Sequence, residues 1–204
     1  MTPFAARTIT IASEVPATAF DCVKFIVVRA GAARLSCGSW VGSVFSGDVL
    51  VVSANTVCSA TPEPQVTVTT LYIDRNYLIA LVYWQFATAF VDRLDVEHFF
   101  DVLFTNHSQQ FRLDHGLLEQ ITAWLDELSA LGQEGIPSGW FYRAQSVLSL
   151  LLDALLPFLT VGDHAEAMTR WRVEHVKRRQ FLSLRQEARR AAELIRTDLR
   201  QHWS

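Results

Sequence analysis

Short apolar runs separated by turn residues dominate the first part of the chain. Five runs rich in β-branched and aromatic residues recur about every ten residues, a spacing typical of an all-β barrel or sandwich. Turn-forming residues lie between them, as at Gly38-Ser39 and Ser46-Gly47-Asp48. We expect a small barrel. The predicted strands are Cys22–Arg29, Ala33–Cys37, Trp40–Phe45, Val49–Ser53 and Val66–Ile73, with further turns at Ala30-Gly31 and Pro62-Glu63-Pro64.

The segments on either side of these runs are less regular. Residues 7–12 alternate polar and apolar, which favours a simple edge strand. After the last run, Asp74 could cap a short helix reaching residue 86, although the β-branched and aromatic content also allows a strand. Residues 92–113 mix charges with phenylalanines and are interpreted as an irregular, partly helical segment. The inward residues of the short helix would be Tyr77, Leu78, Leu81 and either Trp84 or Phe86.

Two strongly periodic helices follow. The first starts after Asp114 with a single apolar stripe and ends near Gly132 and Gly135. The second starts after Pro137-Ser138 and is apolar over most of its circumference, so it must be buried on more than one side. A partner subunit could cover one side, which favours a homodimer over a helical hairpin buried within one chain. The residues expected at the dimer interface are Leu118, Ile121, Leu125 and Leu128.

The charge of the chain is unevenly distributed. The formal net charge is -3, yet ten basic and only four acidic residues lie from Arg170 onward. A positive end on an acidic body is typical of a segment that faces nucleic acid, and a solvated helix face has the same pattern.

Composition and cysteine usage narrow the class of protein. Half of the 204 residues are hydrophobic, enough for one or two domains with a sizeable core. The amino terminus lacks a secretion signal, and the most apolar window, residues 147–161, falls short of the roughly 20 residues that span a bilayer. We therefore expect a cytoplasmic protein with no membrane association. Cys22, Cys37 and Cys58 form no Cys-x-x-Cys pair and are expected to be free, buried or half-buried thiols.

The run Gly47–Cys58 resembles the cupin-type sensor barrel of AraC/XylS-family transcription regulators. The resemblance continues in Thr70–Leu78, in the helical region after it and in the arginine-rich stretch Arg185–Arg196. It implies an α+β fold in three parts: a cupin-like sensor barrel over residues 1–75, a helical segment over 76–160 that packs on the barrel and dimerises, and a charged linker with the first helix of a truncated helix-turn-helix domain over 161–204.

Metal chemistry is not expected in this barrel. Metal-dependent cupins hold their ion mainly with histidines on the barrel strands, whereas all six histidines here lie at His98 or later. Cys58 occupies a position where a cupin motif would often carry histidine. No residues stand in a catalytic spacing either. We therefore predict no metal, no cofactor and no enzymatic activity.

A barrel of this kind without metal would still enclose a pocket for a small-molecule effector. The candidate ligand-binding residues are Lys24, Trp40, Cys58 and Tyr72. Lys24 lies within an apolar run and either anchors the ligand or points to water at an edge, and the exposed orientation is favoured. For Trp40, ordinary core packing is favoured over stacking on a ligand.

The resemblance implies effector sensing and dimerisation that control DNA binding in the full-length protein. The helices that would enter the major groove are missing from a chain that ends at Ser204, so DNA would be bound only through a helix-turn-helix domain beyond it. Two alternatives stay open: a free-standing binding protein that forms mixed dimers with a regulator, and a metal-free cupin-type enzyme.

Overall fold

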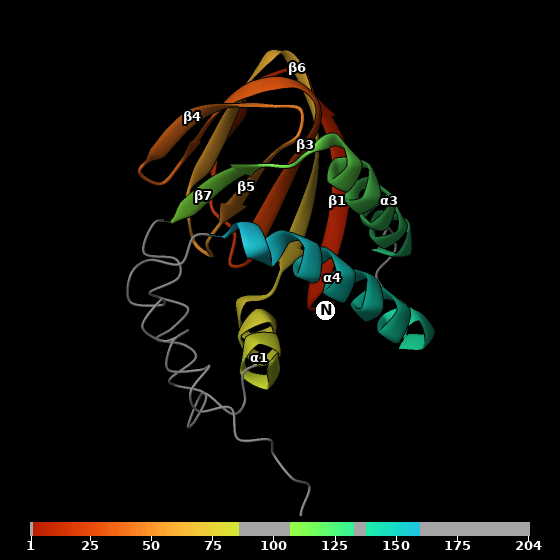
Figure 1. Cartoon of the computed structure of the whole chain (residues 1–204). Coiled ribbons are helices and arrows are strands. Elements are labelled where there is room, and N and C mark those ends of the chain that lie inside the picture. The colour runs from red at the N-terminus through yellow and green to blue at the C-terminus, as the bar shows by residue number, and fades with distance from the viewer. Residues whose placement is uncertain (1, 86–106, 133–137, 160–204) are drawn as a thin grey trace, which may run out of the picture.

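A single antiparallel sheet forms the body of the protein, with helices packed against one of its faces (Figure 1). The computed structural model describes residues 2–85, 107–132 and 138–159, and within these ranges the sheet has seven strands. The predicted α+β class is confirmed. The strands are β1 Phe4–Ile11, β2 Val15–Thr18, β3 Val23–Cys37, β4 Trp40–Phe45, β5 Asp48–Val52, β6 Cys58–Ile73 and β7 Ser108–Arg112; the helices are α1 Arg75–Gln85, α3 His115–Gly132 and α4 Phe141–Leu155, with 3-10 turns at Ser138–Trp140 and Leu156–Phe158.

Two long strands, β3 and β6, form the frame of the sheet. They pair with each other along almost their whole lengths, from Val23 opposite Ile73 to Cys37 opposite Cys58. On its other edge β3 pairs with β5 through its first half and with β4 through its second, and β6 likewise pairs first with β2 and then with β1. Because both strands change partners midway, the sheet curls, and β3 and β6 arch over the top of the molecule (Figure 1).

The bend in β3 lies where the sequence predicts a turn. The β3–β6 register shifts between Val28 and Ala30 and again between Gly31 and Ala33, yet the pairing continues on both sides. Gly31 has φ +80°, and a Cβ there would lie 2.1 Å from the carbonyl oxygen of Gln65. The predicted turn at Ala30-Gly31 is therefore wrong, because these residues form bulges that bend a continuous strand.

The same holds for the predicted turn at Pro62-Glu63-Pro64. These residues lie inside β6, with a cis peptide bond between Glu63 and Pro64. Turn-forming residues thus mark the bends of both long strands and do not end them. The tight turns at Gly38-Ser39 and Ser46-Gly47, by contrast, connect β3 to β4 and β4 to β5 as predicted.

Alternate residues of each strand face two different interiors. Val23, Phe25 and Val27 of β3 belong to the core that the sheet shares with the helices. Val28, Ala33 and Leu35 belong to a second apolar cluster between the curled halves of the sheet. The bulge between Val28 and Ala30 explains how even-numbered and then odd-numbered residues of β3 reach the second cluster, since the extra residue changes which side chains face inward.

The apolar stripe of α3 is used inside the chain. Ile121, Leu125 and Leu128 are 0% exposed and pack in the core shared by α3, α4 and the sheet, and Leu118 is half-buried against the same core. Assigning Ile121, Leu125 and Leu128 to a dimer interface is therefore wrong, because side chains fully buried in their own chain present no surface to a second copy. Whether the chain dimerises through other residues stays a prediction.

Strand β7, like the short β2, was not predicted from the sequence. It pairs with β5 from Asp48 opposite Arg112 to Val52 opposite Ser108, so the sheet is not confined to residues 1–75. The remainder of the segment interpreted as irregular, 92–106, lies outside the described residues. The sequence Ser108-Gln-Gln-Phe-Arg112 has one large apolar residue and therefore little strand signal of its own.

The predicted helix starts at Asp74 and Asp114 are confirmed. Asp74 Oδ1 accepts a hydrogen bond of 2.8 Å from the Tyr77 amide, and Asp114 Oδ1 accepts one of 2.9 Å from the Leu117 amide. In α1, Leu78 is buried as predicted, whereas Trp84 is 69% exposed; Phe86, the alternative predicted to face inward, lies outside the described residues. In the part of the chain that the structure describes, no helix is long and apolar enough to cross a membrane.

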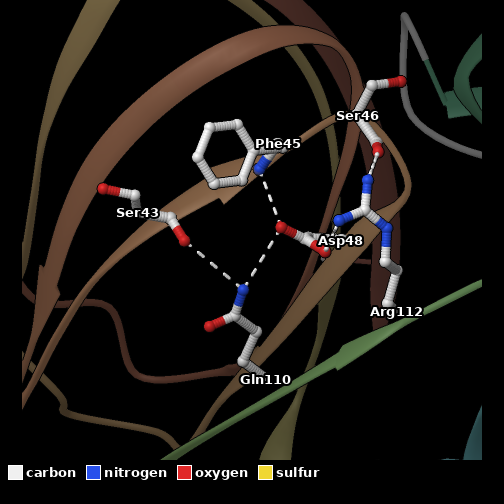
Figure 2. Close-up of polar contacts among 6 residues, drawn as sticks. All are labelled: Ser43, Phe45, Ser46, Asp48, Gln110 and Arg112. Carbon is white, nitrogen blue, oxygen red and sulfur yellow. Dashed lines mark hydrogen bonds and ion pairs between the residues drawn. The ribbon is translucent and has the colours of Figure 1, made fainter.

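A buried carboxylate, Asp48, ties the β4–β5 hairpin to β7 (Figure 2). Its Oδ2 accepts hydrogen bonds from the Phe45 amide at 2.8 Å and from Gln110 Nε2 at 3.2 Å. Arg112 lies 3.9 Å from its Oδ1 and donates to the Ser46 carbonyl at 3.2 Å. The Asp48 side chain, on β5, thereby pairs with donors from two further strands, β4 and β7.

Replacing Asp48 with alanine is expected to lower the free energy of unfolding by about 1–3 kcal/mol, because it removes a buried charged acceptor and leaves the Phe45 amide without its hydrogen-bond partner. Urea denaturation followed by circular dichroism measures the change. Asp153→Ala, which removes an exposed carboxylate from α4, is the matched control and should change stability by less than about 0.5 kcal/mol. Equal effects of the two substitutions would contradict the role given to Asp48.

Candidate functional site: a cavity with a buried lysine and two thiols

A cavity of about 250 Å³ lies between the curled halves of the sheet. Its walls come from β1, β2, β3, β4 and β6, and most of the lining side chains are aliphatic. Polar atoms come from a few positions, among them Lys24, Cys58 and Tyr72, which are three of the four predicted ligand-binding residues. An apolar cavity with a few convergent polar groups is the usual form of a small-molecule site.

Among the described residues that line this cavity, Lys24 is the only cation. It is 4% exposed, so the predicted exposed orientation is wrong. The strand alternation explains this result, because Lys24 shares a face with Ile26 and that face lines the cavity. Its Nζ lies 5.2 Å from the centroid of the Phe20 ring, and its side chain is hydrogen-bonded to Cys58. The ammonium is thus held by a ring face and a sulfur atom.

Cys37 and Cys58 face each other across the β3–β6 pair. Both line the cavity, and their side chains are hydrogen-bonded to each other. Cys37 is 0% exposed, whereas Cys58 is half-buried. Cys22 lies outside the cavity lining, and all three cysteines are free thiols, as predicted.

The two thiols differ in acidity. The hydrogen bond from Cys37 and the Lys24 ammonium together lower the pKa of Cys58 to about 7, against the opposing effect of burial. The same hydrogen bond, together with burial, raises the pKa of Cys37. Near neutral pH Cys58 is therefore partly thiolate while Cys37 remains a thiol that donates to it. Burial raises the pKa of Cys22.

Aromatic side chains border one end of the cavity. Phe20 and Tyr72 make an edge-to-face contact with ring centroids 6.0 Å apart, and Phe20 is 47% exposed, so this end meets solvent. Phe20 was not identified from the sequence because it lies in a loop segment, between β2 and β3, that has no strand periodicity. Its proximity to Lys24 depends on how that loop crosses the sheet, which no local pattern encodes.

Trp40 does not line the cavity. It is half-buried against the second apolar cluster, and a Cβ on Gly42 would lie 2.6 Å from its Cζ2. The ring therefore lies over Gly42, where any larger residue would displace it. Its assignment as a ligand-binding residue is wrong, and the packing role favoured from sequence is the one observed. No group of three or more His, Cys, Asp or Glu side chains in the described ranges could hold a metal ion.

Matches to this chain are found among solved structures only. No family profile and no curated protein matches the sequence. Among solved structures, apo ToxT from Vibrio cholerae, a regulator of the AraC family, matches with 11% identity and a TM-score of 0.53, over 88% of this chain and 68% of that chain. An RmlC-like cupin from Shewanella frigidimarina matches with 13% identity and a TM-score of 0.34, over 36% of this chain and 68% of its own.

A second RmlC-like cupin, from Methanocaldococcus jannaschii, matches with 8% identity and a TM-score of 0.33, over 38% of this chain and 75% of its own. At such low identities the likeness concerns the fold alone. The fold of this chain is similar to that of ToxT over most of its length, and its α+β class agrees with the sequence prediction.

The pKa of Cys58 predicts its reactivity. Alkylation of Cys58 by iodoacetamide, followed by peptide mass spectrometry across a pH series, should reach half its maximal rate near pH 7. Lys24→Met should shift this midpoint upward because it removes the cation that stabilises the thiolate, whereas Cys22→Ser, the matched control, should leave it unchanged. A midpoint at or above about 8.5, the value of an ordinary thiol, would contradict the described environment.

Proposed function

We propose that this chain is the effector-binding and dimerisation region of an AraC-like transcription regulator, in which a small molecule held in the cavity controls DNA binding by the full-length protein. The observation that carries the proposal is the apolar cavity with a buried lysine, Lys24, inside a fold similar to that of ToxT. The proposed role is non-enzymatic, and DNA binding is assigned to the basic carboxyl-terminal segment and any helix-turn-helix domain after it.

The chemistry of the cavity indicates the class of effector. A buried ammonium is costly unless an opposite charge or several hydrogen-bond acceptors surround it. Lys24 has a partly ionised thiol and an aromatic ring as neighbours, so a carboxylate or another acidic group would be a stronger partner. The remaining walls are aliphatic. The effector we propose is therefore a small, mostly apolar molecule with one acidic group.

The connection between cavity and helices runs through β3. Arg29, close to the bend of this strand, places its Nη1 2.7 Å from Asp126 Oδ1 and its Nη2 3.4 Å from the Thr122 carbonyl, both on α3. The strand that carries Lys24 thus also carries the arginine that contacts α3. This contact supports the proposal that a ligand in the cavity influences the helical segment, which is the part proposed to dimerise.

The effector class can be tested with 8-anilinonaphthalene-1-sulfonate, an apolar acid whose fluorescence rises in apolar sites. The chain is expected to bind this probe at one site, and Lys24→Met should weaken binding by about tenfold or more, because the charged hydrogen bond is lost. Nile red, a neutral apolar dye, should bind both proteins with similar affinity, since the aliphatic walls are unchanged.

The matched control is Arg34→Met, which removes an exposed cation from the same strand. It should leave the affinity for the sulfonate unchanged. Cooperative unfolding of each variant, followed by circular dichroism, excludes binding of the dye to a loosened core. Equal weakening by Lys24→Met and Arg34→Met, or binding of neither dye, would contradict the proposed site.

A further inference from the structure

We propose that Cys58 and Cys37 form an oxidisable pair in which Cys58 reduces an apolar organic hydroperoxide inside the cavity and then forms a disulfide with Cys37. The inference deepens the proposed function, on which it rests only in requiring that a small molecule can enter the cavity. The disulfide would be a covalent and reversible response to an oxidant, formed in the same cavity that is proposed to bind an effector non-covalently.

The strand register brings the two sulfur atoms together. Directly opposed residues of an antiparallel pair have Cα atoms about 4.5–5.5 Å apart, which lies within the range of about 4.4–6.8 Å that disulfides span. Cys37 and Cys58 are such a pair, and their side chains point to the same face because both line the cavity. They are already register partners in the β3–β6 pair, so a disulfide needs no exchange of strand partners.

The environment gives the two thiols different roles. Cys58 is half-buried, whereas Cys37 is fully buried behind it, so a molecule in the cavity meets Cys58 first. The Lys24 ammonium is hydrogen-bonded to Cys58, which stabilises a thiolate there. Cys58 is therefore the attacking thiol and Cys37 the resolving one, while Lys24 acts as a positioning residue.

The reaction balances without a metal or cofactor. The Cys58 thiolate attacks the terminal oxygen of the hydroperoxide, the oxygen–oxygen bond breaks, and the leaving alkoxide takes a proton from solvent to become an alcohol. Cys58 is then a sulfenic acid. Cys37 loses its proton and attacks the Cys58 sulfur, and the hydroxide that leaves combines with that proton as water. Two thiols have been oxidised by two electrons, and one hydroperoxide has been reduced.

The walls of the cavity select the kind of oxidant. Aliphatic side chains from five strands surround the thiols, so an oxidant with an apolar body gains burial energy that hydrogen peroxide cannot. Cumene hydroperoxide is the probe of this class, and hydrogen peroxide is its small polar counterpart. The expected rate of thiol loss at pH 7 is at least tenfold higher with cumene hydroperoxide than with hydrogen peroxide at equal concentration.

Peptide mapping of the full chain identifies the bond that forms. Cleavage at arginine and before aspartate separates Leu35–Gly47, which contains Cys37, from Asp48–Ile73, which contains Cys58. After treatment with cumene hydroperoxide, these two peptides should be joined in the unreduced digest and separate after reduction. Cys22 should still be a free thiol, because burial raises its pKa and it lies outside the cavity lining.

Three variants assign the roles. Cys37→Ser should accumulate a sulfenic acid at Cys58 that dimedone traps, and Cys58→Ser should lose no thiol at Cys37 over the same time. Lys24→Met should slow the reaction at pH 7 and recover it at higher pH, a pH shift that a purely structural role would not produce. Cys22→Ser, the matched control, should react like the unchanged chain.

Three results would overturn the inference: Cys22 is oxidised first, disulfides form only between two chains, or the two peroxides react at equal rates. These outcomes are separable from failure of the proposed function. Binding of the anilinonaphthalene sulfonate at the cavity together with no Cys37–Cys58 disulfide would refute the oxidation chemistry alone. If the sulfonate does not bind and no Cys37–Cys58 disulfide forms, the cavity is not accessible to small molecules.

Discussion

The pairing of β3 with β6 is the constraint on which the structure depends. Each strand pairs on its other edge with two different strands, and this is possible only if both bend at the same level of the sheet. Gly31 permits that bend in β3, since a side chain there would collide with the backbone at Gln65. The bend separates the sheet into two halves that face each other, and the cavity is the space between them.

The alternation of side chains along these strands divides the protein into a stabilising face and a chemical face. One face of the sheet packs against α1, α3 and α4, and its core is mainly apolar. The other face carries Lys24, Cys37 and Cys58 among aliphatic residues. A polar group buried on this second face destabilises the fold unless it finds a partner, and these three groups are partnered mainly by one another. Such an arrangement is expected where a site binds or reacts with something.

Much of the fold could be predicted from the sequence because it is encoded locally. Alternating apolar positions identified the strands, and Asp74 and Asp114 identified two helix starts through their capping chemistry. Features that depend on residues distant in the sequence could not be predicted. β7 is a strand only because β5 offers it an edge, and Ala30-Gly31 is a bulge and not a turn only because β6 continues beside it.

The same distinction applies to the site. Lys24, Cys58 and Tyr72 were identified because strand alternation places them on one face, and the structure brings them to one cavity. The burial of Lys24 could not be predicted, since a lysine on a strand is exposed unless the sheet closes over it. Phe20 joins the site from a loop, and Cys37 becomes chemically important only because Cys58 lies opposite.

The central claim is that the inner face of the curled sheet binds small apolar acids, and methyl NMR tests it most directly. Addition of 8-anilinonaphthalene-1-sulfonate to protein labelled at isoleucine and valine methyl groups should shift the signals of Ile9, Val66 and Val68, which line the cavity. The signals of Val49, Val51 and Ile73, which face the helices from the same sheet, should stay in place. Shifts confined to the helix-facing methyl groups, or spread evenly over both sets, would contradict the account.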